Sequence, residues 1–237
     1  AITEASRLPL PSVETGPLEV IEEEALAAVC TRRAAGRVEP TAEEVWRHEL
    51  VVEALMRDRA TLPARFVTTF GEERRLRDVL RRNGPDLSTA LERVRGCVEL
   101  GVRGVWQRPV AEEVESSVMG GGSSGRAYMM ARLARERRRQ EAVMVSQQAA
   151  TAVHEALAPL ARDSHVRTRT AIAGAPQHVL GAAYLVERPA MAEFAAAFAR
   201  RAADLARAAP EVKLLCTGPW PPYHFVPVLQ REGDPVV

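Results

Sequence analysis

A run of glycine, proline and aromatic residues near the end of the chain constrains the fold more than any other segment. An apolar stretch, 214–216, indicates a strand and passes directly into Gly218-Pro219-Trp220-Pro221-Pro222-Tyr223. Glycine permits backbone angles that other residues avoid, and each proline fixes φ and removes a hydrogen-bond donor. We therefore expect the strand to stop at the glycine. A stiff, extended segment would then present three aromatic side chains, those of Trp220, Tyr223 and Phe225.

Composition and charge are typical of a globular, cytoplasmic protein. The 237 residues are 46% apolar and 27% charged, with a formal net charge of +1, so no global field attracts nucleic acid or lipid. The three cysteines are far apart and form no CxxC pair, which argues against a disulfide framework or a zinc site. We find neither an apolar run of the roughly 18 residues that a membrane span needs nor a signal peptide. The chain begins at Ala1 without a methionine, and we expect a few residues to precede it.

Residues 1–95 predict a small N-terminal α+β domain. A strand pair, 18–21 and 26–30, flanks an acidic turn. Thr41 and Glu44 have the spacing of a capping box, which opens a helix. The run 64–70 is rich in β-branched and aromatic residues and predicts a strand, and two short charged helices follow over 72–82 and 86–95. The buried stripe predicted for the first helix consists of Val45, His48, Val51, Val52 and Leu55.

Residues 96–237 predict a C-terminal domain with the element order β-α-β-β-α-β. The expected strands are 97–106, 165–173, 179–187 and 212–217, with a long helix from 126 to about 161 and a second helix after Pro189. This order is typical of a modified ferredoxin-like fold, in which two crossover helices cover one face of a four-stranded antiparallel sheet. A Gly/Ser-rich stretch, 108–125, predicts a loop in this domain, and the Pro/aromatic segment 218–237 closes it.

The sequence contains no constellation of catalytic, cofactor-binding or metal-binding residues. The glycine-rich run 120–127 has the spacing of a phosphate-binding loop, but Arg126 and Ala127 replace its lysine and its hydroxyl residue. The five histidines show no metal-ligand spacing. His48 lies on an apolar stripe, where a hydrogen-bonded core histidine is the expected role. The arginine-rich segment 132–139 has no aromatic residue to stack on bases, so it predicts a solvated face, or a protein partner in preference to nucleic acid.

Two unusual segments supply the candidate partner-binding residues. Arg65 lies inside an apolar run, and a buried arginine needs a carboxylate or carbonyl partner, so cross-bracing and partner binding are both open. The aromatics of the C-terminal segment either fill the core between the domains or form an exposed recognition surface. We favour the core, because aromatic area of this size is usually buried. The candidate residues are Arg65, Phe66, Phe70, Trp220, Tyr223 and Phe225.

Four segments, in the expected order, resemble the gas vesicle protein L/F family (GvpL/GvpF): 48–56, 62–70, 90–103 and 216–225. The last, Cys-Thr-Gly-Pro-Trp-Pro-Pro-Tyr-x-Phe, is the most specific. The second is similar to the family's Leu-Pro-x-Arg-Phe-Gly-Thr-x-Phe strand, with Val67 in place of the usual glycine. Leu100 stands where tryptophan is common. The resemblance also predicts that the family's opening strand is partly lost from this chain.

The resemblance implies a non-enzymatic role in building gas-filled protein organelles in the cytoplasm. The implied partners are the small, very hydrophobic shell subunit and other accessory gas vesicle proteins, with no nucleic acid, membrane or small-molecule substrate. An apolar shell face is an aggregation hazard before assembly, and a protein that covers it or pairs with its strands would keep the subunit soluble.

Two other classes of function remain open. One is a small-ligand-binding regulatory module built on the ferredoxin-like domain, which a ligand in a pocket lined by Arg65 or Tyr223 would favour. An enzymatic function has still less support, because no nucleophile, metal-binding set or cofactor-binding loop is found.

Overall fold

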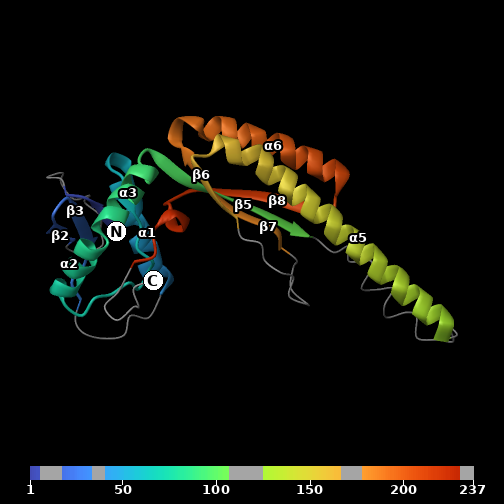
Figure 1. Ribbon diagram of the computed structural model, residues 1–237, viewed down its shortest axis with the longest axis horizontal. Coiled ribbons are helices and arrows are strands. Elements are labelled where there is room, and N and C mark those ends of the chain that lie inside the picture. The colour runs from blue at the N-terminus through green and yellow to red at the C-terminus, as the bar shows by residue number, and fades with distance from the viewer. Residues whose placement is uncertain (6–17, 34–40, 107–124, 167–177, 230–237) are drawn as a thin grey trace. The chain divides into compact units, whose positions relative to one another are not determined.

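The computed structural model describes residues 1–5, 18–33, 41–106, 125–166 and 178–229 (Figure 1). Its strands form two four-stranded sheets, and the chain divides into two compact units. Unit 1 consists of residues 1–99 and 219–237, and unit 2 consists of residues 100–218. The sequence assigned the segment from residue 218 onward to the C-terminal domain. By their contacts, residues 219–237 group with unit 1 and Gly218 groups with unit 2.

The sheet of unit 1 has the strand order β2-β3-β1-β4. Its strands are β1 (Ile2–Glu4), β2 (Glu19–Glu23), β3 (Leu26–Cys30) and β4 (Thr61–Leu62). β2 and β3 form the predicted antiparallel hairpin. β1 pairs antiparallel with both β3 and β4. The short opening strand β1 therefore lies in the interior of the sheet.

Three helices complete unit 1: α1 (Ala42–Asp58), α2 (Glu73–Arg82) and α3 (Gly84–Val94). The N-cap half of the predicted capping box is confirmed, since Thr41 Oγ1 accepts a hydrogen bond from Glu44 N at 3.2 Å, while the Glu44 carboxylate accepts from Arg33. α2 lies against β2, and α3 lies against β1 and β4. The core-facing stripe of α1 is narrower than predicted, because Val52 and Leu55 are buried whereas Val45 is exposed.

The strand expected over residues 64–70 is wrong. β4 ends at Leu62, and a turn lies at Phe66 and Val67. In this turn the backbone N–H and the Oγ1 hydroxyl of Thr68 both donate to Arg65 O, at 3.0 and 2.7 Å. The β-branched composition favoured a strand, but Pro63 cannot donate to a ladder. The bonds from Thr68 to the carbonyl three residues earlier stabilise a turn instead.

Unit 2 contains the predicted β-α-β-β-α-β order, with β5 and β8 continuing across its boundary. The elements are β5 (Cys97–Trp106), α5 (Gly125–Leu157), β6 (Asp163–Val166), β7 (His178–Glu187), α6 (Met191–Ala208) and β8 (Val212–Trp220), with 3-10 turns η1 (Ala158–Leu160) and η2 (Arg188–Ala190). The sheet order is β6-β7-β5-β8. The loop predicted over 108–125 lies outside the described residues except for Gly125, and so does most of the strand expected over 165–173.

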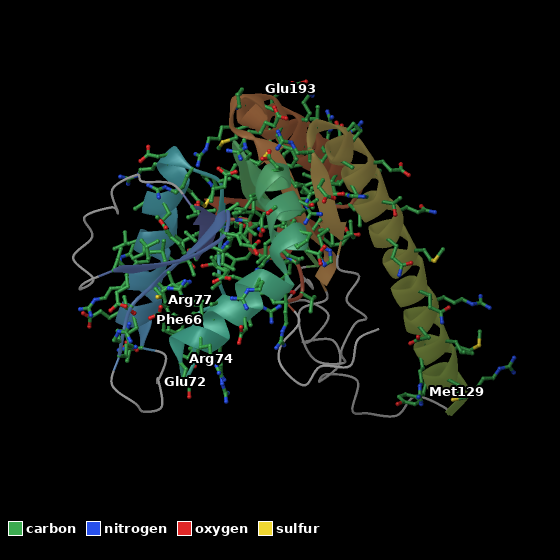
Figure 2. All side chains as sticks on the ribbon, turned by 60° about the vertical axis from the view of Figure 1, so that its left-hand side comes forward. Phe66, Glu72, Arg74, Arg77, Met129 and Glu193 are labelled. Atoms are coloured by element: carbon green, nitrogen blue, oxygen red, sulfur yellow. The ribbon has the colours of Figure 1, made fainter. Side chains whose placement is uncertain are left out.

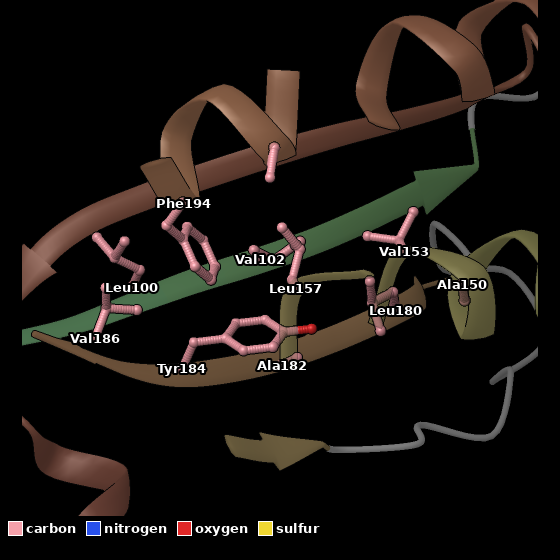
Figure 3. Close-up of a cluster of buried hydrophobic side chains, with 11 residues drawn as sticks. Leu100, Val102, Ala150, Val153, Leu157, Leu180, Ala182, Tyr184, Val186 and Phe194 are labelled. Atoms are coloured by element: carbon pink, nitrogen blue, oxygen red, sulfur yellow. The ribbon is translucent and has the colours of Figure 1, made fainter. Parts of the chain in front are cut away.

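The core of unit 2 lies between the sheet and the two helices that cover one of its faces (Figure 3). Ala150, Val153 and Leu157 of α5 are buried in this core. Tyr184 and Phe194 are fully buried, with ring centroids 5.2 Å apart. The Tyr184 hydroxyl lies 3.0 Å from Nδ1 of His154 on α5, and burial raises the pKa of Tyr184 to about 12.

β8 continues to Trp220, although the sequence predicted that the strand stops at Gly218. Two features allow this continuation. β8 is an edge strand, where proline is tolerated because one row of backbone donors needs no partner. Gly218 has φ of 116°, a conformation that side chains disfavour and glycine adopts readily.

Candidate partner-binding surface

The C-terminal segment of unit 1 is fixed by four polar contacts with that unit. The Tyr223 hydroxyl donates to Glu49 Oε1 on α1 at 2.6 Å. The backbone N–H of His224 donates to Glu99 Oε2 at 2.9 Å, and His224 Nδ1 lies 2.6 Å from Glu99 Oε1. Arg93 Nη2 donates to the carbonyl of Phe225 at 2.8 Å. These bonds hold the 3-10 turn η3 (Tyr223–Phe225) in one position.

Burial makes these contacts energetically important. The Glu99 side chain is buried, and both of its carboxylate oxygens are engaged by His224. Buried polar groups are costly when they lose their partners. Burial raises the pKa of the Tyr223 hydroxyl, and the neighbouring Glu49 carboxylate reinforces the shift. Tyr223 therefore stays protonated and acts as a donor across the physiological pH range.

Two contacts of the His48 side chain join α1 to the turn at residues 66–67. His48 Nε2 donates to the carbonyl of Ala64 at 2.9 Å. The imidazole also meets the Phe66 ring edge to face, with ring centroids 5.7 Å apart, and Phe66 lies beside α1 in Figure 2. Burial lowers the pKa of His48. The predicted hydrogen bond of His48 is confirmed, although the residue is half-buried and not part of the fully buried core.

The six candidate residues differ in exposure. Phe225 is only 3% exposed and belongs to the core of unit 1. Phe66 and Tyr223 are half-buried and packed or bonded as described. Arg65, Phe70 and Trp220 are exposed, Trp220 by 46%. Arg65 is thus not the buried arginine of an apolar strand that the sequence suggested.

The sequence analysis missed an apolar surface on α1, which we call the outer face of α1 and define as Trp46 and Leu50. Both side chains are exposed, and Trp46 is 68% exposed. At about 100° per residue, Trp46 and Leu50 lie within about 40° of each other on the helix, away from Val52 and Leu55. A signal was present in the sequence, because Trp46 lies outside the predicted buried stripe and so had to face away from it.

Other kinds of site find no support in the described parts of the chain. No group of three or more His, Cys, Asp or Glu side chains there is arranged to hold a metal ion. Among the helices described, none is long and apolar enough to cross a bilayer. Cys30, Cys97 and Cys216 are free thiols. What the geometry offers is an apolar, partly aromatic surface on a fixed scaffold.

Comparisons with known proteins point to one family. The family model described as gas vesicle synthesis protein GvpL/GvpF matches residues 1–227. The chain is 31% identical over 193 residues to gas vesicle protein L of Streptomyces sp. (strain CB03234), which covers 78% of this chain and 69% of that protein.

Two crystal structures of gas vesicle protein GvpF are similar in fold. The protein from Anabaena sp. PCC7120 superposes with a TM-score of 0.70 at 14% identity, covering 98% of this chain and 96% of that one. The protein from Microcystis aeruginosa gives a TM-score of 0.61 at 14% identity, covering 94% and 96%. At this identity the two structures show the fold alone.

Proposed function

The chain belongs to the gas vesicle synthesis protein GvpL/GvpF family, and from this premise we propose that it binds the hydrophobic shell subunit and prevents its aggregation during vesicle formation. It would act without an enzymatic step, in the cytoplasm and at the growing gas vesicle. Other accessory gas vesicle proteins would be further partners.

The observation that carries this proposal is the outer face of α1. Trp46 and Leu50 are exposed on a helix whose other side is already buried through Val52 and Leu55. Apolar groups gathered on the surface often mark interaction sites, and tryptophan is among the residues that contribute most to protein–protein binding. A shell subunit with an apolar face offers a complementary surface.

The fixed C-terminal segment supports the same role. The bond from Tyr223 to Glu49 attaches this segment to α1, and the segment carries the exposed indole of Trp220. A side chain on a segment that is already ordered loses less conformational freedom when it binds. Of the residues predicted from sequence, we propose Trp220 and Phe70 as contacts, with Arg65 at the rim. Tyr223, Phe225 and Phe66 position them.

We also propose that unit 2 is a modified ferredoxin-like domain. Its sheet order, β6-β7-β5-β8, places the first and third strands of the β-α-β-β-α-β sequence in the centre. We propose that this domain supports the assembly role of the chain and does not serve as a ligand-binding regulatory module.

Co-expression tests the proposed function. The shell subunit from the same gene cluster is expressed alone, with the full chain, and with the Trp46→Ser/Leu50→Ser variant. Leu215→Ser is the matched control, because Leu215 is an exposed leucine of unit 2. We expect the chain and the control to raise the soluble fraction of the shell subunit, and the double variant to lose this effect. An insoluble subunit in every case, or full activity of the double variant, would refute the proposal.

A further inference from the structure

The first half of α5 extends beyond the core of unit 2. The helix has 33 residues, and among those whose side chains are described the buried ones begin at Ala150. Residues 125–148 therefore form an arm of about 36 Å, at about 1.5 Å per residue. Figure 1 shows this part of α5 continuing past the end of α6, and Figure 2 labels Met129 near its start.

One face of the arm carries exposed apolar side chains although it does not face the core. Four large side chains there are exposed by 55–61%: Met129, Met130, Leu133 and Met144. At about 100° per residue, Leu133 lies about 160° around the helix from the buried Val153, and the four residues fall within an arc of about 100°. We call these four residues the arm stripe.

The arm stripe has the spacing of a helix–helix seam. Met130, Leu133, Arg137, Gln140 and Met144 follow one another at alternating steps of three and four residues, the repeat with which helices pack along each other. A helix that stays in solvent is usually polar on all sides. Methionine also adapts readily to the shape of a partner, so this face suits another helix.

The positive charge of the arm determines which kind of partner helix can bind it. Residues 125–148 contain six arginines and two glutamates, a net charge of +4, and Arg126, Arg132 and Arg137 are exposed. A second copy of the chain would bring like charges together, which is unfavourable. Arg126 and Arg137 also lie on the same face as the arm stripe, where insertion into lipid would bury them. An acidic helix would pair with them.

We propose that the arm stripe docks an amphipathic helix of a partner protein whose apolar seam is flanked by acidic residues. This site lies in unit 2 and is independent of the outer face of α1, to which the shell subunit is assigned above. The partner helix lies along α5, with its apolar residues against Met130, Leu133 and Met144. Its carboxylates pair with the arginines of the arm.

Two synthetic helical peptides with the same Leu/Ile seam, one flanked by glutamates and one by lysines, test this proposal. Their binding to the full chain is measured by fluorescence anisotropy. We expect binding of the acidic peptide only, weakened at least tenfold by Leu133→Glu and by Arg137→Glu. Leu215→Glu is the matched control and binds like the unaltered chain. Circular dichroism confirms that each variant is folded.

Several outcomes would overturn the proposal. Equal binding of both peptides would show that charge does not select the partner, and binding of neither would show that the stripe does not dock such a helix. Self-association in sedimentation that Leu133→Glu abolishes would assign the stripe to a second copy of the chain. Co-sedimentation with phosphatidylglycerol vesicles that depends on the stripe would assign it to lipid. Leu133→Glu should leave shell-subunit solubility unchanged in co-expression, which separates this test from that of the proposed function.

Discussion

The Tyr223 hydroxyl lies 2.6 Å from the Glu49 carboxylate, and this bond joins residues 174 positions apart in the sequence. It connects the C-terminal segment to the helix that carries the exposed Trp46. The neighbouring pair of Glu99 and His224 fixes the next residue of the same segment. The C-terminal part of the proposed binding surface is therefore held in place by contacts with residues of the first hundred positions, all within unit 1.

Removing the hydroxyl of Tyr223 should destabilise unit 1. In Tyr223→Phe the Glu49 carboxylate loses its donor, and a half-buried hydrogen bond to a charged group contributes about 1–2 kcal/mol. We expect a loss of that size in the free energy of unfolding, measured in urea by tryptophan fluorescence. Tyr128→Phe is the matched control and should change nothing, because Tyr128 is exposed. A Tyr223→Phe protein as stable as the unaltered chain would show that the bond is unimportant.

Removing the Glu99 carboxylate should release the C-terminal segment. Glu99 is 5% exposed, so Glu99→Ala removes the buried carboxylate that accepts from the His224 N–H and contacts its Nδ1. We expect chymotrypsin to cleave the variant faster after Tyr223 and Phe225 under native conditions, as read by mass spectrometry. Glu155→Ala, at an exposed position on α5, should be cleaved at the original rate. Equal cleavage of Glu99→Ala would mean that other contacts hold the segment.

Val67 should be a strained position. It has φ of 70°, which costs a residue with a side chain about 1–2 kcal/mol, whereas glycine adopts it freely but loses more entropy on folding. We expect Val67→Gly to raise the free energy of unfolding by about 0.5–1 kcal/mol in urea denaturation, and Val67→Ala to raise it less. A loss of stability in Val67→Gly would contradict this account of the turn.

His48 should make stability depend on pH. Because burial lowers the pKa of His48 in the folded state, the unfolded chain binds a proton more readily. The stabilising contribution is therefore complete above the unfolded pKa of about 6.5 and declines as the pH falls below it. In His48→Gln the amide can still donate to Ala64 O without titrating. Between about pH 7.5 and pH 5 the unaltered chain should lose more stability than this variant, and parallel curves would refute the assignment.

The regular elements of the fold were predictable because their signals are local. The N-cap signal of Thr41 and the hairpin around residues 22–24 each specify an element within a few residues. The residues at which these elements begin and end were harder to predict than the elements themselves. β8 passes through Gly218 and Pro219 because it is an edge strand, which is a property of the whole sheet and not of the local sequence.

The candidate surface depended more on tertiary contacts. The turn at Phe66 and Val67 has strand-like composition, and only the bonds from Thr68 to Arg65 O distinguish it. The burial of Phe225 and the exposure of Trp220 follow from where Glu99 and Arg93 hold the segment, far away in sequence. Trp46 could have been identified as exposed from its position outside the predicted buried stripe.

Photo-crosslinking from position 46 tests the central claim most directly. Trp46→p-benzoylphenylalanine is introduced into the full chain, which is co-expressed with the shell subunit and irradiated, with the same substitution at Leu215 as the control. The account predicts an adduct of the chain and the shell subunit from position 46 and none from position 215. If position 46 gives no adduct while the shell subunit still becomes soluble with the chain, the outer face of α1 is not the binding surface.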